Sequence, residues 1–352
     1  MPSRVSFRYD APELSPQAFA EELAWIVRGP VGLDAYSLGG SVEACEQAFA
    51  RALGKEQAVF MPTGTLANHL ALRALARGRG RVLVQEQGHV YNDSGDCLQR
   101  LSGLSAVPLG HGRAGFTLEE VEAALAAAAA ARVRVEIGAI VLETPVRRRH
   151  GEMFNHFELT RICRFARERG IGLHLDGARI FIASAYTGIA PAEYAAPFDT
   201  VYVSLYKYFG SPCGAVLAGP AALLEGIHHE RRMFGGALNQ AWVFAAAAAA
   251  HLEGFGARFA RVVAASAGFK QGLRQQGFQV ADIANGTNIF RLELEGPEPG
   301  AFRTRLEAAG ILLPQPEGRT FFLKLNESLL ALPVDALVQH FCAARGGGHG
   351  QD

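Results

Sequence analysis

A lysine and an aspartate, each directly after an apolar run, are the residues of this sequence best suited to chemistry. Lys207 follows the run Thr200–Tyr206 and precedes a glycine- and proline-containing turn at 210–214, while Asp176 follows Ile171–Leu175. Ligands of open α/β sheets bind beyond the carboxyl ends of the strands. Taken alone, Lys207 could equally be a solvated surface lysine. The opposite charge of Asp176, expected one strand away, favours a chemical role.

A lysine amine beside a carboxylate suits the chemistry of pyridoxal phosphate. The amine forms a Schiff base with the cofactor aldehyde, and the carboxylate keeps the pyridine nitrogen protonated, so that the ring accepts electrons from a substrate carbanion. We therefore predict that Lys207 and Asp176 are the catalytic core of a pyridoxal-phosphate site.

Four segments, in order along the chain, resemble the successive motifs of the threonine aldolase and β-eliminating lyase family. They are Pro62–Asn68, His174–Arg179, Ser204–Gly210 and Arg231–Gly236, within a similarity that runs from about residue 36 to about residue 245. The resemblance implies the α/β fold-type-I architecture, in which a large domain has a mainly parallel seven-stranded sheet and a smaller carboxy-terminal domain is α+β. It also implies a homodimer or homotetramer with shared active sites.

The pattern of elements predicts how the chain is divided. The expected parts are an amino-terminal arm (1–30), a large cofactor-binding domain (31–245), a small carboxy-terminal domain (246–345) and a disordered tail (346–352).

A predicted strand at 57–61, a turn at 62–64 and a helix from Thr65 to Ala76 make a candidate phosphate site. Gly64 allows close approach, Thr65 adds a hydroxyl, and backbone amides at a helix start attract anions. Alone this turn is a weak signal; Asp176 and Lys207 at the ends of other predicted strands strengthen it. The resemblance adds Ser204 and Arg232 as cofactor contacts, the arginine coming from a partner chain.

Three further residues gain a role through the resemblance. His89 stacks on the cofactor ring and moves protons in the family, although a hydrogen-bonded loop histidine is the alternative. Arg179 binds the substrate α-carboxylate, or forms a structural salt bridge instead. Tyr36 borders the cofactor pocket of a neighbouring subunit, or is a packed aromatic residue.

The residues that differ from the family pattern are mostly those that contact the substrate in the family. Tyr9 replaces a serine, an ungapped alignment puts Val146 in place of a second active-site histidine, and Phe322 replaces an arginine unless Arg319 reaches into the site. The run Arg147–Arg149 is either a solvated loop or a source of new anion contacts.

Composition excludes several classes of function. Lys+Arg and Asp+Glu balance at 34 each, which gives no reason to expect nucleic acid or an anionic membrane as a partner. The five cysteines are scattered without paired spacing, which predicts reduced thiols, no metal site and a cytoplasmic protein. No apolar signal or membrane-spanning run is recognisable.

Three functional hypotheses follow. The first is a lyase resembling low-specificity L-threonine aldolase, which cleaves a bulky or unusual β-hydroxy-α-amino acid into glycine and an aldehyde, with Tyr9, Val146 and Phe322 around the larger side chain. The second keeps the cofactor but changes the reaction to β-elimination, racemisation, transamination or condensation. The third is a catalytically silent protein that binds a partner or metabolite, against which Lys207 and Asp176 argue.

Overall fold

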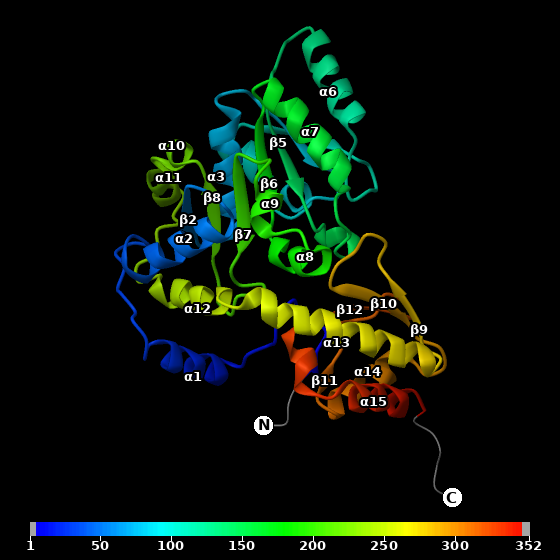
Figure 1. The fold of residues 1–352 in the computed structure, drawn as a ribbon. Helices are drawn as coiled ribbons and strands as arrows, with labels where there is room; N and C mark the ends of the chain where they lie inside the picture. The colour runs from blue at the N-terminus through cyan, green and yellow to red at the C-terminus, as the bar shows by residue number, and fades with distance from the viewer. Residues whose placement is uncertain (1–4, 347–352) are drawn as a thin grey trace, which may run out of the picture.

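The computed structural model describes residues 5–346 (Figure 1). Residues 347–352 of the predicted tail lie outside the described residues, and Gly346 ends the last helix. The strands are β1 (Val5–Ser6), β2 (Gln57–Met61), β3 (Arg81–Gln85), β4 (Ser105–Leu109), β5 (Ile137–Glu143), β6 (Gly172–Asp176), β7 (Thr200–Ser204), β8 (Ala215–Gly219), β9 (Gln279–Asp282), β10 (Ile289–Glu293), β11 (Ile311–Leu312) and β12 (Thr320–Lys324).

Helices connect the strands. They are α1 (Pro16–Ile26), α2 (Gly40–Ala52), α3 (Gly64–Ala76), α4 (His89–Asn92), α5 (Cys97–Ser102), α6 (Leu118–Ala130), α7 (His156–Glu168), α8 (Ile180–Thr187), α9 (Pro191–Ala195), α10 (Ala221–Leu224), α11 (Ile227–Met233), α12 (Trp242–Leu252), α13 (Phe255–Gln275), α14 (Pro299–Ala308) and α15 (Val334–Gly346), with 3-10 turns η1 (Arg147–Arg149) and η2 (Glu327–Ala331). In the described part of the chain, none of them is both long and apolar enough to span a bilayer.

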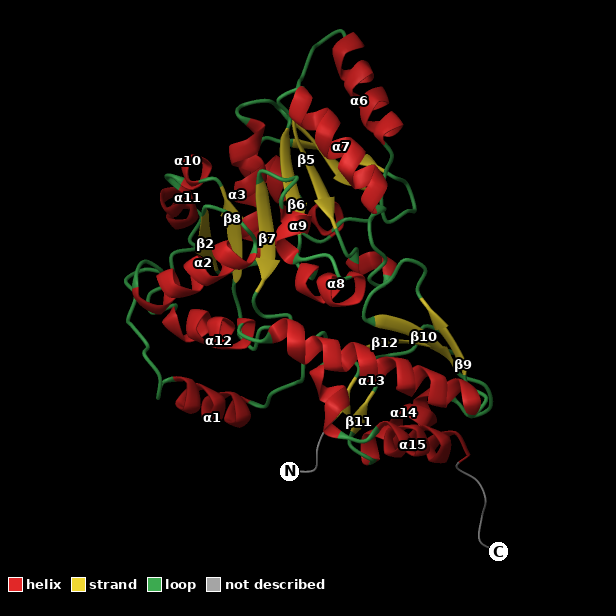
Figure 2. Cartoon of the chain, viewed as in Figure 1, coloured by secondary structure: helices red, strands yellow, loops and turns green. Residues whose placement is uncertain are grey.

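The large sheet has seven strands in the order β2-β8-β7-β6-β5-β3-β4. The part β2-β8-β7-β6-β5 of this order is labelled in Figure 2. Strand β8 runs antiparallel to both of its neighbours, and the other strands are parallel to one another. This confirms the predicted mainly parallel seven-stranded sheet and the fold-type-I class.

Both faces of this sheet are covered by helices, because its strands are apolar on both sides. Phe60 belongs to a core that includes Phe49 of α2 and residues of α7, α8 and α12. The adjacent Val59 and Met61 point the opposite way and pack with Leu70 of α3. Because successive side chains of a strand point to opposite faces, both faces of the sheet are apolar, and the sheet lies between two layers of helices.

A smaller unit stands beside the carboxyl ends of the large sheet's parallel strands (Figure 1). It contains the antiparallel sheet β12-β10-β9 and the parallel pair β1-β11, packed with α13, α14 and α15. Phe7 stacks on Phe269 of α13 at 5.6 Å between ring centroids, and the backbone amide of Lys324 donates to the Phe7 carbonyl at 3.0 Å. The amino-terminal segment therefore helps to position the end of β12.

The order of the parallel strands brings four loop segments to one edge. Strands β3, β5, β6 and β7 are neighbours, and each ends at this edge just before or at a polar residue. These residues are His89 after β3, Glu143 ending β5, Asp176 ending β6, and Lys207 after β7. The edge is where ligands of open α/β sheets bind.

Candidate active site

A cavity of about 630 Å³ opens at this edge of the large sheet. Four residues predicted from the sequence line it, namely Lys207, Asp176, His89 and Arg179, and Tyr9 lies at its exposed side. The remaining lining residues are Asp10, Ala11, Pro12, Glu13, Asp93, Glu143, Arg147, Ala178, Tyr206 and Lys324. Most of the residues that line the cavity are therefore polar or charged.

Lys207 lies three residues beyond β7, between two aromatic rings. Its Nζ is 5.4 Å from the ring centroid of Tyr206 and 5.8 Å from that of Tyr202. Burial, together with the charge of Arg179, lowers the pKa of Lys207 to about 8, against the opposing effect of Asp176. A lysine with a pKa near neutrality has a useful fraction of free amine, which is the nucleophilic form.

Asp176 is held by a chain of hydrogen bonds that runs away from the cavity. Its carboxylate accepts from Asn68 Nδ2 at 2.7 Å and from the Ala178 amide at 3.2 Å. Asn68 Oδ1 is 2.8 Å from His174 Nε2, and His174 Nδ1 is 2.8 Å from Thr200 Oγ1. All four side chains are buried, so the orientation of Asp176 is fixed by groups that water cannot replace.

The proton positions along this chain follow from its ends. An ionised carboxylate can only accept, so the Asn68 amide nitrogen faces Asp176 and its oxygen faces His174. His174 Nε2 must then carry a proton, and Nδ1 accepts from the Thr200 hydroxyl. Burial lowers the pKa of His174 to about 4, so the ring is neutral near pH 7, as this pattern requires.

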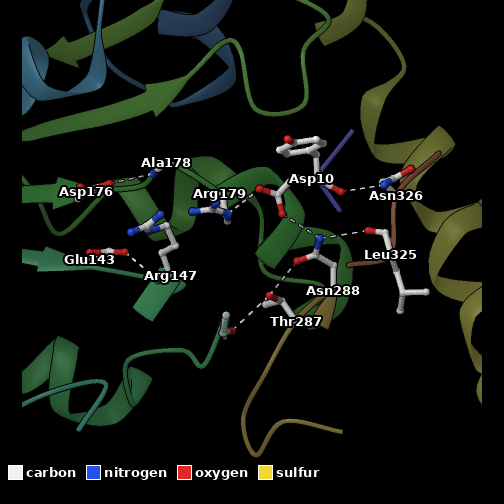
Figure 3. A network of polar contacts seen from close by, with 12 residues as sticks. Asp10, Glu143, Arg147, Asp176, Ala178, Arg179, Thr287, Asn288, Leu325 and Asn326 are labelled. Carbon is white, nitrogen blue, oxygen red and sulfur yellow. Dashed lines mark hydrogen bonds and ion pairs between the residues drawn. The ribbon is translucent and has the colours of Figure 1, made fainter. Parts of the chain in front are cut away.

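A hydrogen bond joins the backbone of His89, which follows β3, to the side chain of Glu143, which ends the neighbouring strand β5. The backbone amide of His89 donates to Glu143 Oε2 at 2.6 Å, and the amide of Arg147 donates to Glu143 Oε1 at 2.9 Å (Figure 3 shows the second bond). Burial and the charge of Asp176 raise the pKa of Glu143 to about 7. Burial lowers the pKa of His89, so that its half-buried ring is a neutral proton acceptor near pH 7.

Arg179 forms a buried ion pair with Asp10 on the wall of the cavity, the salt bridge predicted from the sequence as the alternative to substrate binding (Figure 3). Arg179 Nε is 2.9 Å from Asp10 Oδ2, and Asn288 Nδ2 donates to Asp10 Oδ1 at 3.2 Å and to the Leu325 carbonyl at 3.1 Å. Burial alone would raise the pKa of Asp10, but the charges of Arg179 and Lys324 and the Asn288 bond hold it below its ordinary value.

The small sheet supplies a cation that was not predicted from the sequence. Lys324, at the end of β12, lines the cavity two residues beyond Phe322, the position predicted to replace a family arginine. Phe322 lies flat on the ring of His150, with 3.6 Å between ring centroids, and is not among the residues lining this cavity. Arg319 donates to the carbonyls of Leu294, Gly296 and Pro297, so it does not supply the missing charge.

Val146, predicted as a substrate contact, is fully buried and does not line the cavity. Its amide donates to the Glu152 carbonyl at 2.8 Å, which turns the chain so that the next residue, Arg147, faces the cavity instead. The three substituted positions Tyr9, Val146 and Phe322 therefore do not form one apolar pocket.

The residues predicted to bind the phosphate, Gly64, Thr65 and Ser204, do not line the 630 Å³ cavity; the first two lie at the amino terminus of α3. This helix begins at Gly64, one residue earlier than expected, and the Thr63 hydroxyl accepts from the Leu66 amide at 3.1 Å. A Cβ at Gly64 would collide with the Tyr202 hydroxyl, so only glycine leaves the helix start open. Thr65 follows and is half-buried.

The surroundings of the Ser204 hydroxyl indicate whether the region beside the start of α3 could bind a phosphate. Side chains alternate along β7, so Ser204 points to the same face as Tyr202, whose hydroxyl lies against Gly64. Ser204 Oγ is fully buried and interacts with the Tyr202 hydroxyl, but it makes no hydrogen bond of normal geometry among the described residues. A buried hydroxyl with spare hydrogen-bonding capacity beside a helix start is compatible with an oxyanion.

Tyr36 and Arg232 lie together but outside the cavity. The Arg232 guanidinium is 5.1 Å from the Tyr36 ring centroid, and both residues are exposed. The preceding Arg231 is buried and donates to the carbonyls of Phe60, Tyr36 and Ser37 at 2.6, 3.3 and 3.2 Å, which fixes the Tyr36 turn. Within one chain these two predicted residues do not reach Lys207.

A lysine and an aspartate at adjacent strand ends, on a three-layer sheet of this topology, define a fold-type-I enzyme. The chain belongs to the β-eliminating lyase family, whose model matches residues 24–292. It is 30% identical over 228 residues to the low-specificity L-threonine aldolase of Saccharomyces cerevisiae, a match covering 64% of this chain and 58% of that protein. The corresponding Escherichia coli K12 protein is 26% identical over 310 residues, 88% of this chain and 90% of its own length.

Solved structures agree with this family. A Listeria monocytogenes structure assigned as an L-allo-threonine aldolase superposes with a TM-score of 0.81 at 25% identity, over 97% of this chain and 96% of that one. A Sphingomonas wittichii serine palmitoyltransferase has a TM-score of 0.71 at 19% identity, over 97% of this chain and 86% of that one. The second likeness concerns the fold alone.

Proposed function

We propose that the protein is a pyridoxal-phosphate-dependent carbon–carbon lyase that cleaves a β-hydroxy-α-amino acid into glycine and an aldehyde. The observation that carries the proposal is the pairing in one cavity of Lys207, whose pKa is lowered, with the buried carboxylate of Asp176. Family membership and the likeness to low-specificity L-threonine aldolases support it.

The residues present suit the cofactor at each end. Ser204 and the helix start at Gly64 and Thr65 would hold its phosphate, Asp176 would hold the pyridine nitrogen, and Lys207 would bind its aldehyde carbon. When bound, the cofactor supplies an electron sink for negative charge that develops at the substrate Cα.

Side chains of the protein would bind the substrate and transfer its protons. Arg179, anchored by Asp10, and Lys324, which also acts on Asp10 by its charge, would bind the substrate α-carboxylate. Neutral His89 would cover the ring and accept the β-hydroxyl proton, and the Lys207 amine would move a proton to Cα after the Cα–Cβ bond breaks. The electron pair of that bond remains on the glycine half.

We further propose that the active sites are shared between subunits of a homodimer or homotetramer. The exposed Tyr36–Arg232 pair, which lies outside its own chain's cavity, supports this arrangement because it is free to border the site of a neighbour.

The second candidate is a diverged reaction on the same cofactor, such as β-elimination or condensation. It is favoured by one observation: a cation, Arg147, and not a neutral hydrogen-bonding group, faces the cavity beside the Val146 position. A mixture of the holoenzyme with β-hydroxy amino acids from threonine to phenylserine separates the two. Equimolar glycine and aldehyde are expected; a spectral change without aldehyde would favour the diverged reaction.

A further inference from the structure

A second cavity, of about 340 Å³, shares three lining residues with the first and so continues from it. We call it the basic annex, defined by the shared Arg147, Arg179 and Lys324 together with Arg148, His150, Gly151, Ile289 and Phe322. It lies between the η1 turn of the large domain and strands β10 and β12 of the small sheet.

The annex is lined by three arginines, by Lys324, whose pKa burial lowers from its ordinary value, and by no carboxylate. The nearby Glu317 acts on His150 by its charge but does not line the annex. Partially desolvated like charges in one cavity repel one another, and an anionic ligand would relieve that repulsion.

The carboxylates next to the annex leave this charge incompletely balanced. Asp10 is taken by Arg179 at 2.9 Å, and Asp93 is shared between Arg147 at 3.0 Å and Arg148 at 3.7 Å. No hydrogen bond or ion pair joins the Lys324 ammonium to another side chain in the described residues. Asp10 also acts on Lys324 by its charge, and Glu143 acts on Arg179, whereas Arg147 and Arg148 share the single carboxylate of Asp93.

The α-carboxylate of an amino-acid substrate would balance only one of these charges. Under the proposed function it lies between Arg179 and Lys324, near the cofactor end. Arg147 lines both cavities and stands at their junction, with its backbone fixed by Glu143, and Arg148 lines the annex alone. The His150 and Phe322 rings are stacked in nearly parallel planes, with an angle of 4° between them, and offer a flat surface for a carbon skeleton.

We propose that the substrate carries a second anionic group on its side chain, a carboxylate or a phosphate, which Arg147 and Arg148 bind in the basic annex. The inference rests on the proposed retro-aldol function and names its substrate class. The hydroxyl proton leaves, the Cα–Cβ bond breaks with its electrons on Cα, Cα takes up a proton to give glycine, and the aldehyde product keeps the distal anion. Guanidinium groups suit both anions because they form paired hydrogen bonds with either.

The test compares substrates of one shape and different charge. The holoenzyme is assayed with β-hydroxyglutamate, its neutral amide β-hydroxyglutamine, and the γ-phosphate ester of γ-hydroxythreonine. We expect kcat/KM for at least one anionic substrate to exceed that of the amide by tenfold or more, a factor consistent with one charged hydrogen-bonded contact. The better of the two identifies the anion. Equal cleavage of the amide and both anions would overturn the inference while leaving the retro-aldol proposal intact.

Arg148 and Arg149 make a matched pair of variants. Arg149 pairs with Glu152 at 3.1 Å and lines neither cavity, whereas Arg148 lines the annex. Arg148→Ala should reduce the anion-to-amide preference at least tenfold, and Arg149→Ala should leave it unchanged. Equal effects of the two substitutions would overturn the inference.

A binding measurement keeps the inference testable if no substrate is cleaved. Glutarate and inorganic phosphate are titrated into each holoenzyme by calorimetry. Weakening of the Kd for either anion by tenfold or more in Arg148→Ala alone would support the annex and place the failure on the retro-aldol proposal. The same Kd in both variants, or no binding to either, would overturn the annex.

Discussion

The hydrogen-bond chain behind Asp176 makes a quantitative prediction. Asn68→Ala removes the 2.7 Å bond to the carboxylate and leaves the buried His174 Nε2–H without an acceptor. Loss of a hydrogen bond to a charged group costs about 1.5–3 kcal/mol, and a buried unsatisfied donor costs about 1–3 kcal/mol. We therefore expect the apoprotein to lose about 3–5 kcal/mol of unfolding free energy in urea titrations.

The same substitution should weaken cofactor binding, because Asp176 loses its fixed orientation. We expect the Kd for pyridoxal phosphate to rise at least tenfold in Asn68→Ala. His69→Ala is the matched control: the neighbouring His69 is also buried but hydrogen-bonds to Ser102 at 2.7 Å, away from Asp176. Lower stability changes the apparent Kd only when a sizeable fraction of the protein is unfolded, so a variant that stays mostly folded should keep its Kd unless the site itself has changed. Equal Kd values for pyridoxal phosphate in the two variants would refute the role of this hydrogen-bond chain. So would a loss of unfolding free energy below about 1 kcal/mol in Asn68→Ala.

Three further predictions concern individual groups. The rate at which apoprotein reacts with pyridoxal phosphate should rise with pH and level off above about 8, because the free amine of Lys207 is the reactive form; a stopped-flow rate still rising steeply at pH 10 would indicate an ordinary lysine. Asp10→Asn breaks the buried ion pair with Arg179 and should lower the unfolding free energy measured in urea by about 3–5 kcal/mol. Arg8→Ala, which breaks a partly exposed ion pair, should lower it by less than about 1 kcal/mol. Similar losses in the two variants would show that the buried pair does not stabilise the fold. Ser204→Ala should leave apoprotein stability nearly unchanged and weaken pyridoxal phosphate binding at least tenfold, whereas unaltered affinity would exclude Ser204 from the phosphate site.

Much of the fold was predictable from local patterns. Apolar runs bounded by glycine and proline marked the central strands, and the strand-end positions of Asp176 and Lys207 followed from those runs. The mainly parallel seven-stranded sheet was implied by the family resemblance and is confirmed; the apolar runs alone are typical of buried parallel strands and do not give their order.

The substrate side of the site was less predictable. Lys324 comes from the small sheet, and only the folded chain brings β12 to the edge of the large sheet. Asp10, next to the substituted Tyr9, and Glu143, which ends a buried strand, had a visible signal, but their partners are distant in sequence. In an irregular turn a shift of one residue exchanges buried and exposed side chains, which is why Arg147 and not Val146 faces the cavity.

The most direct test of the account identifies the lysine that binds the cofactor. The chain has four lysines, Lys55, Lys207, Lys270 and Lys324, and only Lys207 and Lys324 line the cavity. Borohydride reduction of the holoenzyme fixes the cofactor to its lysine, and peptide mass spectrometry locates it. The label is expected on Lys207; a label on Lys324, or none on any lysine, would show that Lys207 does not bind the cofactor.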